Sequence, residues 1–318
     1  MADPFDDYAR AVKPLVDAAT AAELSRILDG LPLAHRDRVE AALDGGKKVR
    51  GVLLCLLCEA LGGGVGDALP RAAAVELVQA ASLLHDDVVD GDAQRRGHPA
   101  TWVLEGTRRA VLVGDAIFAW AIHRMSVLGR EDGLIVAEAI ARIAQGACRE
   151  LLGGPEPGAA PRLGQVPPGL YLRIIRLKTG VLFAAACRLG ARAAGGDGCL
   201  DRAAGRYGMA LGEAYQIADD RMDVERWLAG ARPNPAQATA FGPALAHFAR
   251  GEPLGELPAQ GPWPRELLET AARAMETALH RRLGRARRLA AALPGRGPGA
   301  ERLRRAPEAL VGQLLRRG

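Results

Sequence analysis

Two acidic clusters occur in the chain, each directly after an apolar stretch with helical spacing. The first lies in LLHDDVVDGDAQRRGHPAT (83–101) and the second in GEAYQIADDRMDV (212–224). Carboxylates four positions apart share one helix face, and each would be costly to bury without compensation. Hard carboxylate oxygens suit Mg²⁺, which takes one or two of them and leaves its other positions to water and phosphate. Two such clusters facing one another across a helical bundle would hold metal ions around a shared diphosphate. The six carboxylates are Asp86, Asp87, Asp90, Asp219, Asp220 and Asp223.

Cationic side chains accompany these clusters. Arg95 and Arg96 follow the first one, and arginine binds phosphate oxygens in a bidentate manner. GGKKVRG (45–51) brings Lys47, Lys48 and Arg50 to a helix start, where cations oppose the helix dipole unless an anion binds there. The alternative for this motif is a solvated basic turn.

A further lysine stands on an otherwise apolar helix. YLRIIRLKTG (171–180) contains Lys178 and Thr179. A single lysine in such a setting is usually a surface side chain whose stem covers apolar area. This alternative stays open on the residues alone.

The spacing of apolar residues is helical throughout, with no convincing period-two segment. We therefore predict one all-α domain over residues 1–318, built as a large helical bundle, with loops at 153–169 and 251–264. The predicted helices are 5–28, 33–44, 47–62, 70–90, 107–128, 131–152, 170–193, 199–228, 238–250, 264–293 and 300–316.

The composition is that of a soluble globular protein, with 49% hydrophobic and 25% charged residues. The N-terminus is acidic and has no apolar core of a signal peptide, and no run of about 18 apolar residues predicts a membrane span. Five scattered cysteines indicate reduced thiols and a cytoplasmic location. Cys55 and Cys58 are interpreted as small core hydrophobes, and a metal or redox CxxC site is the alternative.

Taken together, the motifs resemble those of the trans-isoprenyl diphosphate synthases, the polyprenyl synthetase family. GGKKVR is similar to the family's GGKxxRP, and SLLHDDVVDGDAQRRGHPAT to its first aspartate-rich motif. LVGDAIFAWA, the pair Gln145–Gly146, RLKTGVLF and YGMALGEAYQIADDRMD follow in the family's order and spacing. The resemblance covers most of residues 45–224 and implies an all-α fold with a deep central cavity and a homodimer.

The resemblance also implies a role for each matching residue. Magnesium is the implied cofactor, three ions per active site, and isopentenyl diphosphate and an allylic diphosphate are the implied substrates; no nucleic acid is expected as a partner. The implied direct metal ligands are Asp86, Asp90 and Asp219, with Asp87, Asp220 and Asp223 nearby or holding water. Arg95 and Lys178 are implied to bind the allylic diphosphate, Lys47, Arg50 and Arg96 to bind isopentenyl diphosphate, and Thr179 and Gln216 to face the allylic cation.

The chemistry that this family implies needs charge neutralisation and exclusion of water. Diphosphate leaves when its developing charge is neutralised, and the double bond of isopentenyl diphosphate then attacks the allylic cation. The sequence offers no obvious protein base for the proton that is lost, so the bound diphosphate is the expected acceptor. An apolar cavity must keep water from quenching the cation.

Small residues below the first aspartates predict a long product. At about 1.5 Å per residue, Ala81 and Ser82 lie roughly 6–8 Å below the metal site, with Val78 and Ala74 deeper. No bulky floor stands at these positions, so we expect a product of about twenty carbons or longer. A deeper floor is expected from Phe118 or Trp120.

The chain departs from the family pattern at three places. Gln79 replaces a histidine that contacts isopentenyl diphosphate, and Gln79 can still donate a hydrogen bond. Gly51 replaces a proline, which is expected to change local rigidity. The downstream GKxxGxD and GKxT motifs are missing, and Arg232 is the nearest replacement for the first of their lysines.

These departures leave two other functions open. One is a class I terpene cyclase or an atypical prenyl-coupling enzyme on the same fold, which would use only the allylic substrate. The other is a non-catalytic regulatory subunit of a synthase, which the two intact aspartate clusters disfavour. The Arg-rich C-terminal part is interpreted as a solvated face, with peripheral contact to anionic membrane as the alternative.

Overall fold

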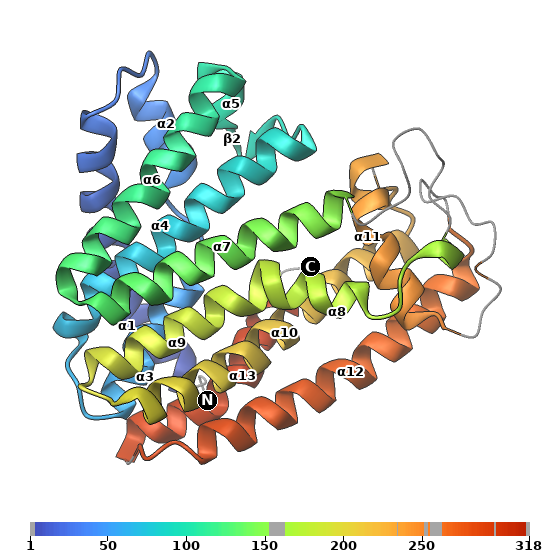
Figure 1. Cartoon of the computed structure of the whole chain (residues 1–318). Coiled ribbons are helices and arrows are strands. Elements are labelled where there is room, and N and C mark those ends of the chain that lie inside the picture. Colours follow the sequence, from blue (N-terminus) through green and yellow to red (C-terminus); the bar gives the residue numbers. More distant parts are fainter. Residues whose placement is uncertain are drawn as a thin grey trace. The chain divides into compact units, whose positions relative to one another are not determined.

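The computed structural model describes residues 4–152, 163–233, 235–250, 254, 263–295 and 297–315. Over these residues the chain is almost entirely helical (Figure 1), so the predicted all-α fold is confirmed. One short antiparallel ribbon interrupts the helices, between β1 (Gln94–Arg95) and β2 (His98–Pro99).

The chain divides into two compact units. The first comprises residues 1–141, 182–208 and 289–306, and the second 142–181, 209–288 and 307–318. Each unit has its own hydrophobic cluster, and each is described by itself. The interpretation of the whole chain as one domain stays a prediction.

The first unit is organised around α4, which packs against α1, α3 and α6. In Figure 1 the cyan α4 and the green α6 lie side by side, and α4 carries the first acidic cluster at its end. The elements that lie wholly in this unit, besides the two strands, are α1 (Pro4–Asp29), α2 (Arg36–Leu43), α3 (Val49–Ala60), α4 (Val65–Asp90), α5 (Thr101–Glu105) and α6 (Thr107–Leu128).

A cluster of aliphatic side chains holds α1, α2, α4 and α6 together. Leu24 and Leu28 of α1 meet Leu77 and Leu84 of α4, and Ile117 of α6 completes the contact. These side chains are almost fully buried, and each contributes about 1.5–3 kcal/mol through its removal from water. The position of the helix that carries the first aspartates is therefore set by apolar packing.

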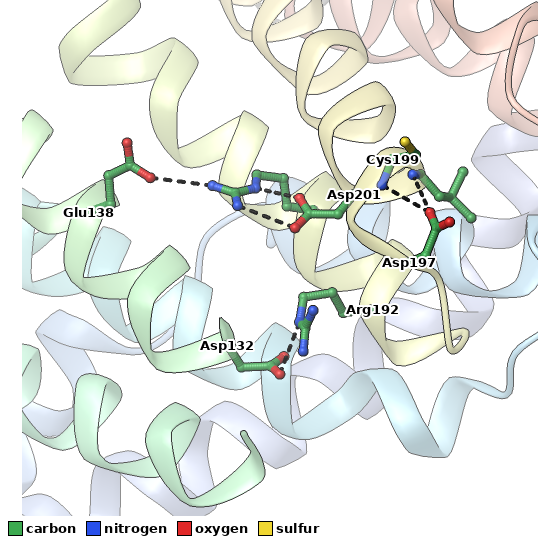
Figure 2. Close-up of polar contacts among 8 residues, drawn as sticks. Asp132, Glu138, Arg192, Asp197, Cys199 and Asp201 are labelled. Carbon is green, nitrogen blue, oxygen red and sulfur yellow. Dashed lines mark hydrogen bonds and ion pairs between the residues drawn. The ribbon is translucent and has the colours of Figure 1, made fainter. Parts of the chain in front are cut away.

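A network of ion pairs fixes α4, α7 (Arg130–Leu152), α9 (Val181–Ala193) and α10 (Gly198–Leu228) to one another in this unit. Figure 2 shows its contacts between α7, α9 and α10. Asp132 is buried and accepts hydrogen bonds from Arg71 at 2.7 Å and from Arg192 at 3.1 Å. Arg188 pairs with Asp201 and, at 3.4 Å, with Glu138. A buried carboxylate with two guanidinium partners is compensated in charge, and removing both partners would leave an uncompensated charge.

The second unit contains residues 209–228 of α10, and this part of the helix carries the second acidic cluster. Its own elements are η1 (Leu163–Gln165), α8 (Leu170–Ile175), the π-helical turn η2 (Arg176–Gly180) and α11 (Pro235–Phe248), with most of α12 (Arg265–Ala291) and the end of α13 (Gly297–Leu315). Buried side chains of α8, α10, α11 and α12 form its core together with Trp263, among them Tyr171, Ile217, Phe241 and Met275.

The predicted helices are present, with boundaries that differ by a few residues. The largest difference is α4, which begins at Val65 and continues through Pro70, where the sequence predicted its start. The predicted helix 170–193 contains the π-helical turn, and α5 and the β1–β2 ribbon were not predicted. The predicted loops fall largely on 153–162 and 251–262, which lie outside the described residues apart from residue 254.

Cys55 and Cys58 are fully buried on α3. Burial raises the pKa of the Cys55 thiol to about 12 and that of Cys58 to about 11. Both behave as small hydrophobes, so that interpretation is confirmed. All five cysteines are free thiols.

One helix among the described residues, α6, is long and apolar enough to cross a membrane by length and composition alone. No run in the sequence had predicted this. Its inner face packs on α4, and its outer face carries Val111, Leu112, Val127 and Leu128 among the exposed large hydrophobic residues. Such a helix is weak evidence for a membrane span, because core helices of soluble proteins pass the same test.

Candidate active site

The first acidic cluster occupies the last turns of α4. Gly91 ends the helix in a left-handed conformation, with φ of 71°, and its N–H bonds to the carbonyl of Asp87. Asp86 is half-buried and Asp90 is exposed, whereas Asp87 is buried. The three carboxylates therefore have different surroundings, although they stand within five residues.

Asp87 pairs with Arg95 from strand β1. The Nε atom of Arg95 donates to Oδ1 of Asp87 at 2.8 Å, and Nη2 donates to the same oxygen. Burial raises the pKa of Asp87 above its usual range, and the hydrogen bond from Arg95 offsets part of that rise. In this structure Arg95, implied as a diphosphate ligand, compensates Asp87.

Arg96 joins the hairpin to the glycine-rich motif. Its Nη1 donates to the carbonyl of Leu43 at 3.2 Å and to that of Asp44 at 2.7 Å, at the C-terminal end of α2. Gly46 has a φ of 87°, a conformation that favours glycine, and a Cβ there would stand 2.8 Å from Nη2 at the end of the Arg96 side chain. Residues 45–46 and Arg96, fifty positions apart in sequence, thus share one surface.

The start of α3 is held by two buried charged side chains. Lys48, with φ of 47°, lies within 3.3 Å of Asp44 Oδ1 through its Nζ atom. Glu76 of α4 accepts a 2.7 Å hydrogen bond from the N–H of Gly51. Proline has no such N–H, so Gly51 changes a hydrogen bond here as well as local rigidity.

The other predicted cationic ligands of this motif lie at its edge. Lys47 is exposed, and the guanidinium of Arg50 lies 4.6 Å from the ring centre of Phe183. Gln79 is half-buried on α4, and its carbonyl accepts a hydrogen bond from Ser82 Oγ at 3.0 Å.

The predicted chain-length positions lie on α4 and α6. Ala81 and Val78 are fully buried, and Ser82 is half-buried. Phe118 contacts His85, with ring centres 5.5 Å apart. Because His85 directly precedes Asp86, this contact places Phe118 beside the turn that carries the aspartates, and its part in a deeper floor stays a prediction. Trp120 instead bonds Glu23 of α1 at 3.0 Å.

In the second unit a chain of hydrogen bonds ends on the second acidic cluster. Thr179 Oγ1 donates to Gln216 Oε1 at 2.6 Å, and Gln216 Nε2 donates to Asp220 Oδ1 at 2.9 Å. The hydroxyl of Tyr171 donates to Asp220 Oδ2 at 2.6 Å. Three of the predicted residues are thereby connected, and Tyr171 joins them.

Asp220 has an unusual acidity as a result. Burial raises the pKa of this carboxyl to about 7, and the hydrogen bonds from Tyr171 and Gln216 offset part of the rise. The neighbouring Asp219 and Asp223 raise it further. Asp219 is exposed, and Asp223 pairs with Arg226.

The π-helical turn presents Lys178 and Thr179. The Val181 N–H bonds to the carbonyl of Arg176, five residues back, which is the π-helical pattern. Lys178 pairs with Glu150 of α7. A Cβ at Gly146 would stand 2.9 Å from the backbone nitrogen of Lys178. The Gln145–Gly146 motif therefore lets α7 approach the turn closely.

The acidic side chains suit Mg²⁺ by their chemistry. Asp86 and Asp90 are hard oxygen donors one turn apart at an accessible helix end, and Asp219 is exposed. No group of three His, Cys, Asp or Glu residues among those described is arranged to hold a metal ion. Mg²⁺ needs only one or two carboxylates when phosphate supplies the rest, so the donor set fits.

The sequence matches the family described as polyprenyl synthetase over residues 36–227, more than half of the chain. The chain belongs to the polyprenyl synthetase family. It is 41% identical over 191 residues to geranylgeranyl diphosphate synthase of Mycobacterium tuberculosis, covering 60% of this chain and 54% of that relative. It is 31% identical over 220 residues to octaprenyl diphosphate synthase of Haemophilus influenzae, covering 69% and 65%. The chain thus spans little more than half the length of the most similar of these relatives.

Solved structures of the family resemble the chain over nearly its whole length. A decaprenyl diphosphate synthase from Rhodobacter capsulatus has a TM-score of 0.74 at 28% identity and covers 97% of this chain and 99% of its own. A polyprenyl synthase from Caulobacter crescentus, complexed with calcium and isoprenyl diphosphate, has a TM-score of 0.75 at 29% identity, covering 96% and 97%.

Three polar residues of the site were not predicted from the sequence. Tyr171 and Glu150 bond the predicted Asp220 and Lys178, and Glu76 holds the start of α3. Tyr171 stands seven residues before Lys178, two helical turns away, and this spacing was the only signal for it. A glutamate inside the apolar stretch 72–81 was the signal for Glu76.

Proposed function

We propose that this protein is a magnesium-dependent trans-prenyltransferase, which condenses isopentenyl diphosphate with an allylic diphosphate. The product is an (E)-polyprenyl diphosphate of about twenty carbons or longer. The observation that carries the proposal is the hydrogen-bonded chain from Thr179 through Gln216 to Asp220, which connects two motifs of the family within one unit. Family membership and relatives named as geranylgeranyl and octaprenyl diphosphate synthases support it.

The residues that would hold the metal are Asp86, Asp90 and Asp219. When bound, Mg²⁺ supplies positive charge that stabilises the departing diphosphate. Asp87, buried against Arg95, orients the end of α4 and keeps that arginine beside the cluster. Asp220 lies beside Asp219, and Tyr171 and Gln216 fix its orientation.

The cationic side chains would bind the two diphosphates. Arg96 and the loop containing Gly46 share one surface, which supports binding of isopentenyl diphosphate by Arg96, Lys47 and Arg50. Lys178 would exchange Glu150 for the allylic diphosphate. Arg232 is exposed in the irregular segment after α10 and would replace the first missing lysine.

The developing allylic cation would be stabilised by neutral oxygens. Thr179 and Gln216 bring hydroxyl and amide oxygens to the π-helical turn without adding a full charge that would trap the cation. The buried aliphatic cluster on α4 and α6 keeps water from the growing hydrocarbon. The released diphosphate is the acceptor for the proton, since the motifs offer no other base.

We further propose a homodimer in the cytoplasm. The exposed apolar face of α6 supports an interface between two copies, since Leu112 and Val127 are each 65% exposed. Sedimentation of the wild type and of a Leu112→Arg variant tests this, with a dimer expected for the first and a monomer for the second. A monomeric wild type would overturn it.

The function is tested with purified protein, isopentenyl diphosphate and each of three allylic diphosphates, with Mg²⁺ or with EDTA. Chain-extended diphosphates that appear only with Mg²⁺ would support the proposal. Asp86→Ala and Asp219→Ala should nearly abolish turnover while the circular dichroism spectrum stays unchanged. Cyclic hydrocarbons from the allylic substrate alone, or activity that survives chelation, would contradict it.

A further inference from the structure

A cavity lies in the unit that carries Asp220, and of the motifs above only YLRIIRLKTG (171–180) contributes to it, through Leu172. It opens between α8, α11 and α12 and has a volume of about 390 Å³. This size is within the range of about 300–1,000 Å³ that holds small-molecule ligands. Its walls are formed by Leu172, His247, Phe248, Ala274, Thr277, Ala278, Arg281 and Arg282.

One part of the lining is cationic. Arg281 is exposed at the mouth. Arg282 lies deeper and donates to Glu213 at 3.0 Å, but Arg176 uses the same carboxylate at 3.3 Å. The guanidinium groups of Arg282 and Arg176 therefore share the single negative charge of Glu213, and Arg281 adds a third guanidinium group. The rim of the cavity keeps an excess of positive charge.

His247 offers a polar atom in the same wall. Its Nδ1 atom is buried and has no hydrogen-bond partner among the described residues. Burial and the nearby Arg250 and Arg282 lower the pKa of His247, so its imidazole is neutral near pH 7. A buried polar atom without a partner costs free energy, which a ligand that bonds it would recover.

The remaining lining is hydrocarbon. Leu172, Phe248, Ala274 and Ala278 contribute apolar side chains. A cavity with cations at one part and hydrocarbon at another matches a molecule with an anionic head and an apolar tail. An inorganic anion would leave the apolar wall in contact with water, and a neutral lipid would leave the excess charge unpaired.

We propose that this cavity binds an amphiphilic anion, with its phosphate on Arg281, Arg282 and His247 and its tail against Leu172 and Phe248. The ring of Tyr171 would separate the bound phosphate on His247 from the second acidic cluster. His247 stacks on Tyr171, with ring centres 5.5 Å apart and planes at 29°, and Tyr171 bonds Asp220. Occupancy of the cavity would thus reach Asp220 through Tyr171. The site does not depend on the reaction proposed above, and its test needs no turnover.

The test is calorimetric titration of the full chain in EDTA, which removes any metal-dependent diphosphate binding at the aspartates. The probes are octyl phosphate, geranyl monophosphate, inorganic phosphate and octanol. Both organic phosphates should bind at least about tenfold more tightly than inorganic phosphate or octanol. Inorganic phosphate contacts only the cationic part of the cavity, and octanol only the apolar part. Tighter binding of geranyl monophosphate would point to an isoprenoid ligand, and tighter binding of octyl phosphate to a straight-chain one; either result supports the site.

Two variants at exposed lining positions locate the binding. Arg281→Glu reverses a charge at the mouth and Thr277→Trp fills the space, and each should weaken octyl phosphate binding by about tenfold or more. The matched control is Arg304→Glu, the same charge reversal at an exposed position of α13 in the other unit. Absence of binding to the wild type, or equal weakening by Arg304→Glu, would overturn the proposal, as would inorganic phosphate binding as tightly as octyl phosphate.

Discussion

The hydroxyl of Tyr171 lies 2.6 Å from Oδ2 of Asp220 and donates to it. The phenol is buried, and burial beside Asp220 raises its own pKa well above the usual value, so it remains a proton donor. A tyrosine that cannot ionise holds a carboxylate next to Asp219, the implied metal ligand. The contact fixes the orientation of the second acidic cluster in the absence of metal.

Tyr171→Phe removes this donor and keeps the ring contacts with His247 and Phe248. We expect the Mg²⁺ concentration for half-maximal activity to rise by about 10–100-fold, as is usual when a group that orients a metal ligand is lost. Tyr207→Phe is the matched control, because its hydroxyl bonds the Leu303 carbonyl at 3.1 Å in the other unit. Equal Mg²⁺ dependence in the two variants would refute the role of Tyr171.

Asp220 predicts a pH dependence of stability in the metal-free protein. Its pKa is about 7 in the folded state, against about 3.9 in an unfolded chain. Between these values the folded state binds more protons, so the free energy of unfolding from this residue falls as pH rises, by up to about 1.4 kcal/mol per pH unit. The loss is complete above the folded pKa and absent below pH 4.

Urea unfolding in EDTA at pH 5 and pH 8 measures this effect. Asp220→Asn keeps a polar partner for Tyr171 and cannot ionise. The stability of Asp220→Asn relative to the wild type should therefore be greater at pH 8 than at pH 5. A stability difference that does not change with pH would show that Asp220 is not perturbed in the folded state.

How far the sequence predicts this structure differs between its helices and its contacts. The helices follow from apolar periodicity, and α6 has the predicted bounds. Pro70 misplaced the start of α4, because proline favours the first turn of a helix, whereas here it is the sixth residue of α4. The π-helical turn at Lys178 was not predictable from the sequence. A single turn with hydrogen bonds over five residues does not visibly change the spacing of apolar residues.

The residue types of the site were predictable, and the pairings between them were not. Spacing placed Asp86, Asp87 and Asp90 at one helix end, but it could not show that Asp87 turns inward to Arg95. Which carboxylate is buried depends on how α4 is rotated against α2 and the hairpin. Glu150 was missed for the same reason, because its partner Lys178 stands 28 positions away.

Gly51 should tolerate the family's proline poorly in this chain. Gly51→Pro removes the N–H that bonds Glu76 at 2.7 Å and leaves a buried carboxylate without that donor, at a cost of about 1–3 kcal/mol. Gly51→Ala is the control for crowding, since it keeps the N–H while its Cβ would stand 2.7 Å from Val16 Cγ1. Chemical unfolding compares the two. A proline variant as stable as the wild type would show that the hydrogen bond is dispensable.

Arg232 is expected to assist the allylic substrate alone. It stands nine residues after Asp223 in an exposed segment and is the nearest cation to the missing lysine. Arg232→Ala should raise the KM for the allylic diphosphate by about tenfold, which is the effect of losing one charge-assisted hydrogen bond. The KM for isopentenyl diphosphate should stay unchanged. The exposed Arg226→Ala, which removes the partner of Asp223 instead, is the comparison. Equal changes in both KM values for Arg232→Ala would exclude this role.

The length of the product depends on the side chains below the first aspartates. Ala81 and Ser82 lie about one turn before Asp86, roughly 6–8 Å down α4. Ala81 is fully buried against α1 and α6, and Ser82 is half-buried. Both side chains are small and form no bulky floor, so the wild type should make a product of about twenty carbons or more.

Ala81→Phe should shorten that product, because the ring would occupy the path of the tail. The same ring overpacks a buried position at a cost of about 1–3 kcal/mol, so the assay is run below the midpoint of thermal unfolding. Ser82→Phe adds the ring at a half-buried position, and it should shorten the product even if Ala81→Phe does not fold. Ala119→Phe, at an exposed position of α6, should leave product length unchanged. Mass spectrometry of the dephosphorylated alcohols measures the length; a wild-type product of fifteen carbons, or unchanged products from both α4 variants, would show that the tail follows another route.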